Sequence, residues 1–157
     1  MWRRAKAGMM PKAEFTVTLM DETTVVQVAE IAAACFTTPW SAGAYARELT
    51  NPMAITLTAV SGDTVMGFVN CGFVADELTV NALAVLPEYR RMGLGRTLME
   101  HLFAWMKETC TVCYLEVRES NTAAQALYES LGFVKNGYRA NYYEQPAEAA
   151  VLMMKAM

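Results

Sequence analysis

The chain has 157 residues, of which 54% are hydrophobic, and its formal net charge is −3. This length fits a single domain with a substantial core, and the acidic balance argues against general nucleic-acid binding. No apolar run approaches the ~20 residues that a membrane-spanning helix needs. The basic stretch 1–8 lacks the apolar segment of a secretory signal. We therefore expect residues 1–14 to be a disordered or loosely attached extension, residues 15–157 to be the domain, and the cytoplasm to be its location, with no membrane partner.

The domain is predicted to begin with a strand and two helices. Phe15–Leu19 alternates between apolar and polar residues, which predicts a strand. Asp21 can cap a helix that runs to about Phe36. Ser41 can cap a second, short helix that ends before Asn51.

Three strand-like runs follow, at residues 55–60, 65–74 and 78–86. The turn residues Ser61–Asp63 join the first two as a hairpin, and Asp76–Glu77 marks the next turn. The third run is almost entirely apolar, which is typical of a central strand.

The second half of the chain predicts two helices and three strands. A helix from Gly93 to about Glu108 carries an apolar stripe, made of Leu94, Leu98, Leu102, Trp105 and Met106. Thr111–Val117 predicts a strand. Ser120 or Asn121 can cap the next helix, whose stripe is Ala124, Leu127, Tyr128 and Leu131 and which Gly132 ends. The last strands are predicted at 133–143 and 149–154.

This order, β-α-α-β-β-β-α-β-α-β-β, predicts an α+β fold. The strands joined by short turns give a mostly antiparallel first half, and the strand–helix–strand unit around Gly93 predicts a right-handed crossover. We expect a mixed central sheet of about seven strands with about four helices.

The four cysteines have one pair at metal-ligand spacing, Cys110 and Cys113. A structural zinc site would want a second pair, and the one histidine, His101, is predicted on the exposed side of its helix. We therefore predict reduced cysteines in or near the core and no metal.

The segment from Arg90 to Arg96 has the composition of an anion-binding loop. It follows an apolar strand, contains Gly93 and Gly95, and leads into a helix whose first backbone N–H groups lack partners. A dinucleotide-binding fingerprint would need a third glycine at 98, where the chain has Leu98, and a P-loop would need the sequence G-K-[ST], which is absent. The diphosphate of an acyl-coenzyme A is the remaining candidate.

Several motifs in this order resemble the GNAT superfamily of N-acetyltransferases, and within it the RimI-type ribosomal-protein alanine N-acetyltransferases. The segment Arg90-Arg-Met-Gly-Leu-Gly95 fits the signature Q/R-x-x-G-x-G/A. The resemblance spans about Phe36 to the C-terminus, with further matches at 39–41, 81–85, 115–121, 126–133 and 141–143.

The resemblance implies an acetyl-CoA-dependent transfer of an acetyl group to a protein N-terminal α-amine, with alanine of a ribosomal protein as the expected acceptor. It places the donor on the strand residues Leu83, Ala84 and Val85, on the loop residues Arg90, Arg91, Met92, Gly93, Leu94, Gly95 and Arg96, and on Asn121. It makes Glu116 the general base and Tyr128 the general acid.

Other interpretations of these residues stay open at this point. Glu116 could be a solvated glutamate paired with an arginine, Tyr128 a core tyrosine, and Asn121 an N-cap. The resemblance also suggests acceptor-binding residues, namely Trp40, Asp76, Glu77, Tyr142 and Tyr143. A lysine side chain or a small-molecule amine is the alternative acceptor, and a non-catalytic acyl-CoA-binding module is a further alternative.

Overall fold

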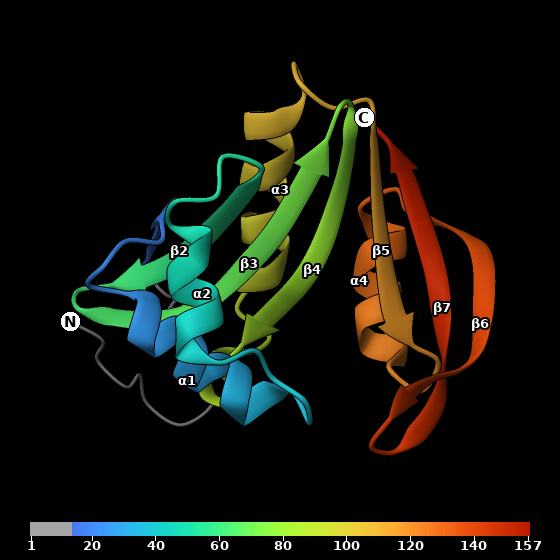
Figure 1. Ribbon diagram of the computed structural model, residues 1–157, viewed down its shortest axis with the longest axis horizontal. Coiled ribbons are helices and arrows are strands. Elements are labelled where there is room, and N and C mark those ends of the chain that lie inside the picture. The colour runs from blue at the N-terminus through green and yellow to red at the C-terminus, as the bar shows by residue number, and fades with distance from the viewer. Residues whose placement is uncertain (1–13) are drawn as a thin grey trace.

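The computed structural model describes residues 14–157, and these form one mixed sheet covered by helices on both faces (Figure 1). The sheet has seven strands in the order β1-β2-β3-β4-β5-β7-β6. The elements are β1 (Thr16–Leu19), α1 (Val25–Cys35), α2 (Ala42–Glu48), β2 (Ala54–Ser61), β3 (Thr64–Val74), β4 (Glu77–Val85), a 3₁₀ turn (Pro87–Tyr89), α3 (Leu94–Met106), β5 (Val112–Arg118), α4 (Thr122–Ser130), β6 (Val134–Glu144) and β7 (Ala147–Ala156). The predicted order and fold class are confirmed.

Two details of the helices differ from the prediction. α1 begins at Val25 rather than directly after Asp21, because the Asp21 carboxylate accepts hydrogen bonds from the backbone and hydroxyl of Thr23 and organises a turn ahead of the helix. Trp105 is 52% exposed and does not belong to the buried stripe of α3, where Met99 is buried instead. The predicted caps at Ser41 and Asn121 are confirmed, since their side chains accept from the amides of Ala44 and Ala124.

Two apolar clusters hold the helices on the sheet. One joins α3 and α4 to one face of the sheet, with Leu98, Leu102 and Tyr128 among its buried members. The other joins α1 and α2 to the opposite face, through Ile31, Tyr45 and Phe68. Each such side chain contributes about 1.5–3 kcal/mol when it is fully buried. These clusters fix the helices against the sheet and so position the ends of β4 and β5.

The cysteines lie in or near this core, as predicted. Cys71, Cys110 and Cys113 are buried, Cys35 is half-buried, and all four are free thiols. Residues 14–157 contain no group of three or more His, Cys, Asp or Glu side chains that could hold a metal ion. In the same range, no helix is both long enough and apolar enough to cross a membrane.

The sheet is interrupted between its two halves. β4 and β5 run parallel but pair only over Glu77–Thr79 and Val112–Tyr114. Beyond these residues β4 continues beside β3, and β5 continues beside β7. The two strands therefore diverge towards their carboxyl ends, and Figure 1 shows β4 and β5 separating below their paired segment.

Candidate active site

The loop before α3 has the backbone conformation of an anion-binding turn. Arg91 and Gly93 both have positive φ, at 63° and 82°. The first bond of the helix runs from the Thr97 amide to the Gly93 carbonyl over 3.0 Å. The amides of the preceding first turn, at residues 94–96, have no partner within the helix and carry the positive end of its dipole. This end of α3 can accept a phosphate group.

Two of the three loop arginines contact the protein itself. Arg90 donates from Nε to the Val85 carbonyl over 2.9 Å, which ties the loop to the end of β4. Arg96 donates to the hydroxyl of Ser130 and lies 3.8 Å from Glu100, which ties α3 to the end of α4. The positive charge that the sequence predicted at this loop is therefore held in place by neighbouring strands and helices.

The edge of β4 that faces the split has free hydrogen-bonding capacity. The Leu86 amide donates towards β3, to the Met66 carbonyl. Because residues of an antiparallel ladder alternate in direction, Ala84 also bonds towards β3, whereas Leu83 and Val85 direct their N–H and C=O groups towards the split. An extended ligand can therefore continue the ladder along Leu83 and Val85.

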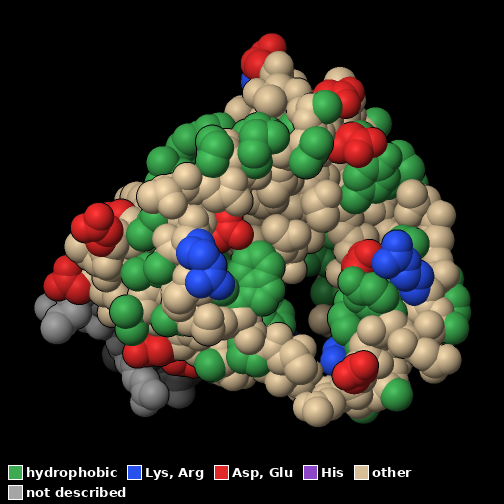
Figure 2. Space-filling view, in the orientation of Figure 1, with side chains coloured by type: hydrophobic (Ala, Val, Ile, Leu, Met, Phe, Trp, Pro, Cys, Tyr) green, Lys and Arg blue, Asp and Glu red, His purple; other side chains and the backbone are tan. Residues whose placement is uncertain are grey.

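A cavity of about 550 Å³ occupies the split between β4 and β5. Figure 2 shows this face of the molecule hollowed between the two halves of the sheet. The cavity brings together predicted residues from separate parts of the chain, namely Trp40, Leu83, Glu116, Asn121, Tyr128 and Tyr143. Among these predicted residues, the Glu116 carboxylate, the Asn121 amide, the phenols of Tyr128 and Tyr143 and the Trp40 ring thus border a single space.

Glu116 comes from β5 and projects to the face opposite the α3–α4 core. Its neighbours Leu115 and Val117 are buried, while Glu116 faces the cavity with a side chain that is 33% exposed. Its carboxylate lies 3.6 Å from the guanidinium of Arg139. The sequence left two interpretations of Glu116 open, a solvated glutamate paired with an arginine and a catalytic carboxylate. In the structure Glu116 both pairs with an arginine and faces the cavity.

Tyr128 comes from α4 and lies at the floor of the cavity. Its ring packs against Phe133 at 5.6 Å between centroids, and it is buried within the main core cluster. Burial raises the pKa of the Tyr128 phenol well above its usual value. The phenol therefore stays protonated at neutral pH, as a proton donor must.

Asn121 and the aromatic residues complete the wall. The Asn121 side-chain oxygen accepts from the Ala124 amide over 3.1 Å, so the N-cap prediction is confirmed, and its NH₂ group is left for other partners. Trp40 packs on Tyr45 at 5.4 Å between centroids. Tyr142 and Tyr143 contact each other at 5.0 Å between centroids, edge to face, and Tyr143 lines the cavity.

Tyr142 is exposed and does not line the cavity, and two further predicted acceptor residues lie elsewhere. Asp76 and Glu77 are at the start of β4, where the parallel pairing with β5 closes the sheet. The Asp76 carboxylate accepts from the Thr111 hydroxyl over 2.7 Å, across this closed end. Neither residue lines the cavity, which opens at the other end of the strand. Ala84, Val85 and the loop 90–96 lie outside the cavity wall, at the end of β4.

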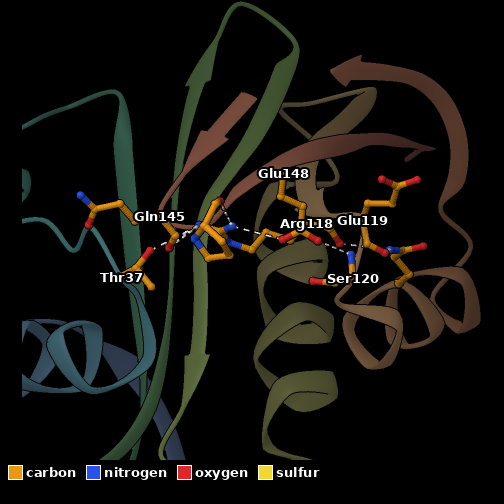
Figure 3. Close-up of polar contacts among 8 residues, drawn as sticks. Thr37, Arg118, Glu119, Ser120, Gln145 and Glu148 are labelled. Carbon is orange, nitrogen blue, oxygen red and sulfur yellow. Dashed lines mark hydrogen bonds and ion pairs between the residues drawn. The ribbon is translucent and has the colours of Figure 1, made fainter. Parts of the chain in front are cut away.

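No role was predicted for Arg118, whose guanidinium makes four hydrogen bonds at the cavity wall. Figure 3 shows its guanidinium between Thr37 and Gln145 on one side and Glu148 on the other. Alternation along β5 places Arg118 on the same face as Glu116, two residues earlier. That alternation is the signal that could have identified it.

Comparisons with known proteins bear on the family and the fold of this chain. A model described as the acetyltransferase (GNAT) family matches residues 25–133. A ribosomal protein bS18-alanine N-acetyltransferase of Haemophilus influenzae is 37% identical over 119 residues, which cover 73% of this chain and 80% of the relative. The crystal structure of the ribosomal-protein-S18-alanine N-acetyltransferase from Escherichia coli superposes with a TM-score of 0.83 at 34% identity, covering 91% of this chain and 94% of that one. Arabidopsis thaliana NAA60 in complex with acetyl-CoA has the same fold, with a TM-score of 0.84 at 15% identity over 92% of this chain and 99% of that chain.

Proposed function

This chain belongs to the GNAT family of acetyltransferases and is therefore an acyltransferase, and we propose that it moves the acetyl group of acetyl-CoA to the α-amine of a protein N-terminus. The proposed acceptor is the N-terminal alanine of ribosomal protein bS18, the acceptor in the names of its relatives. The observation that carries the proposal is the meeting of Glu116 and Tyr128 at one cavity beside the free edge of β4.

The residues around the cavity fit the chemical parts of acetyl-CoA. The first-turn amides of α3 and the arginine-rich loop suit its diphosphate. The N–H and C=O groups of Leu83 and the N–H of Val85, whose carbonyl already accepts from Arg90, suit the amide-containing pantetheine arm, and the Asn121 NH₂ group can donate to it. When bound, acetyl-CoA supplies an electrophilic thioester carbonyl and a thiolate leaving group.

Glu116 and Tyr128 then divide the proton transfers between them. Glu116 takes a proton from the acceptor ammonium, directly or through a water molecule, and frees the nitrogen lone pair. A backbone N–H of β4 stabilises the negative charge that develops on the carbonyl oxygen. The nitrogen–carbon bond then forms, the carbon–sulfur bond breaks, and Tyr128 donates its proton to the sulfur. The nitrogen gives up its second proton in the same step, and this proton returns Tyr128 to the phenol through water.

An α-amine suits this machinery better than a lysine side chain. The pKa of an α-amine is about 8 and that of lysine is about 10.4, so neutralising lysine at pH 7 costs about 3 kcal/mol more. A single carboxylate base can therefore deprotonate an α-amine more easily than a lysine side chain. Trp40 and Tyr143 border the cavity and give a polypeptide acceptor two aromatic surfaces to pack against.

The test is a comparison of two peptides. One has a free N-terminal alanine, and the other is blocked at its N-terminus and carries one lysine. We expect acetyl transfer to the first peptide at least about tenfold faster than to the second, and loss of transfer in Glu116→Gln by about 10²-fold or more. Equal rates on both peptides would contradict the α-amine assignment, and an unaffected Glu116→Gln variant would contradict the role of the base.

A further inference from the structure

Arg118 is held at the end of β5 by several contacts with the chain around the β6–β7 turn. Its guanidinium donates to the Pro146 carbonyl over 3.0 Å, to the Glu148 carboxylate over 3.1 Å and to the Gln145 carbonyl over 3.3 Å. All three acceptors belong to the turn between β6 and β7 or to the start of β7. The same guanidinium lies 4.4 Å from the centroid of the Tyr143 ring. Arg118 thus fixes both the turn and an aromatic side chain of the cavity wall.

The remaining contact of Arg118 crosses the split. Its Nη2 atom donates to the hydroxyl of Thr37 over 3.3 Å, and Thr37 lies between α1 and α2, 81 positions earlier in the chain. β4 and β5 do not pair at this end of the sheet. The bond from Arg118 therefore joins the α1–α2 side of the cavity to the β5–β7 side, where the backbone ladder leaves them apart (Figure 3).

Glu148, the carboxylate that binds Arg118, is itself held by a second hydrogen bond. Glu148 accepts from the Ser120 amide over 2.6 Å with its second oxygen, while its first binds Arg118. The Gln125 side chain, which is buried in α4, donates to the Arg118 carbonyl over 3.1 Å. Hydrogen bonds from the side chain and the amide of Ser120 and from the Arg118 guanidinium hold the pKa of Glu148 below its usual value, so this carboxylate remains an anion at neutral pH.

We infer that Arg118 is a positioning residue for the acceptor. Its guanidinium forms a clasp, which joins the Thr37 loop to the 145–148 turn across the split. The clasp holds Tyr143 beside the place where the acceptor N-terminus meets Glu116. This inference rests on the proposed function. Arg118 and Glu116 project from the same face of β5 two residues apart, so the clasp and the base share one rigid strand. A guanidinium keeps its protons at physiological pH, which rules out a role as acid or base and leaves a geometric one.

The diphosphate loop and the edge of β4 on the donor side are held by contacts other than this clasp. The loop 90–96 and the free edge of β4 are tied together by Arg90 and Val85, not by Arg118. Loss of the clasp is therefore expected to weaken use of the acceptor and to leave use of acetyl-CoA unchanged. A general loss of fold would affect both substrates, so the two kinetic constants separate positioning from stability.

The experiment measures initial rates for Arg118→Gln, Arg118→Lys and Thr37→Val, varying the alanine peptide and acetyl-CoA in turn, together with melting temperatures. Thr37→Val is nearly isosteric and removes only the contact across the split. Lys135→Gln is the matched control, because Lys135 is an exposed cation paired with Glu129 at 3.8 Å outside the cavity.

We expect Arg118→Gln to raise the peptide KM about tenfold, and Thr37→Val about threefold, with the acetyl-CoA KM within about twofold of wild type. Arg118→Lys keeps the charge but not the planar set of donors, and is expected to fall between Arg118→Gln and wild type. Lys135→Gln is expected to match wild type.

Unchanged peptide KM values in the folded variants would overturn the inference, as would equal rises in the KM of both substrates. If the Arg118 variants do not fold, Thr37→Val alone tests the inference. A peptide KM of Thr37→Val equal to that of wild type then overturns it. Wild-type protein that acetylates no α-amine peptide would instead overturn the proposed function, and this inference with it.

Discussion

The guanidinium of Arg139 on β6 lies 3.6 Å from the carboxylate of Glu116 on β5, although β7 separates the two strands in the sheet. Arg139 also lies over the Tyr142 ring, 5.4 Å from its centroid. The positive charge beside Glu116 therefore stands where the ammonium group of an acceptor must approach the base. Arg139 and the acceptor are expected to compete for one carboxylate.

Replacing Arg139 by Gln should remove this competition. The Arg139 side chain is 57% exposed, so the pair is screened and contributes about 0–1 kcal/mol to stability. We expect the peptide KM to fall about two- to threefold at low ionic strength, and the difference from wild type to vanish at about 0.5 M salt. Kinetics at two salt concentrations, with Lys135→Gln as control, check this. A peptide KM that rises in Arg139→Gln would mean that Arg139 binds the acceptor instead.

Tyr128→Phe should separate chemistry from folding. The substitution keeps the ring that packs on Phe133 and removes only the hydroxyl, so the melting temperature should stay close to that of wild type. We expect kcat to fall about 10- to 100-fold, because the sulfur loses its proton donor. Since burial raises the pKa of Tyr128, the wild-type kcat should not decline up to about pH 10. A Phe variant with the wild-type kcat would exclude Tyr128 as the acid.

Gly93 and Gly62 form a matched pair for testing the loop. Both have positive φ, at 82° and 60°, and neither would bring an added Cβ within 4 Å of another atom. Alanine at either position should cost about 1–2 kcal/mol of stability through the left-handed backbone alone. Only Gly93→Ala should also weaken acetyl-CoA binding, by about tenfold, because the backbone of Gly93 sets the positions of the amides at the start of α3. Calorimetric titration checks this, and equal acetyl-CoA affinities in the two variants would contradict the loop assignment.

The buried thiols predict how stability depends on alkaline pH. Burial raises the pKa of Cys71 and of Cys113 from the ordinary value of 9.0 to about 12. Below pH 9 their contribution is fully present, because both the folded and the unfolded thiols are protonated. From about pH 9 to about pH 12 the unfolded thiols lose protons that the folded ones keep, so the free energy of unfolding falls by up to about 1.4 kcal/mol per pH unit for each thiol.

Urea unfolding of wild type and Cys71→Ala between pH 8 and pH 10.5 measures this effect. The variant should be less stable at pH 8, because it leaves a cavity, and should lose stability more slowly as the pH rises. Parallel pH dependences in the two proteins would show that the Cys71 thiol is not protected in the folded state.

The sequence predicted what depends on local patterns and missed what depends on distant contacts. The capping chemistry of Ser41 and Asn121 and the alternation around Glu116 are local, and the structure has them as expected. Trp105 was misplaced because it lies at the margin of the helical stripe, where periodicity does not decide burial.

The long-range part of the site required the register of the sheet. Asp76 and Glu77 were predicted as acceptor-binding residues, but the short parallel pairing at Glu77–Thr79 puts them at the closed end of the split. Arg118 was missed because its partner Thr37 lies 81 positions away. No local pattern reveals a contact of that kind.

The most direct test is a structure of the protein with a bisubstrate ligand, in which CoA is joined through its acetyl group to an N-terminal alanine peptide. The account predicts the diphosphate on the amides at the start of α3, the sulfur within hydrogen-bonding reach of the Tyr128 hydroxyl, and the peptide nitrogen facing Glu116. A diphosphate bound away from α3, or a peptide nitrogen on the far side of the cavity from Glu116, would contradict it.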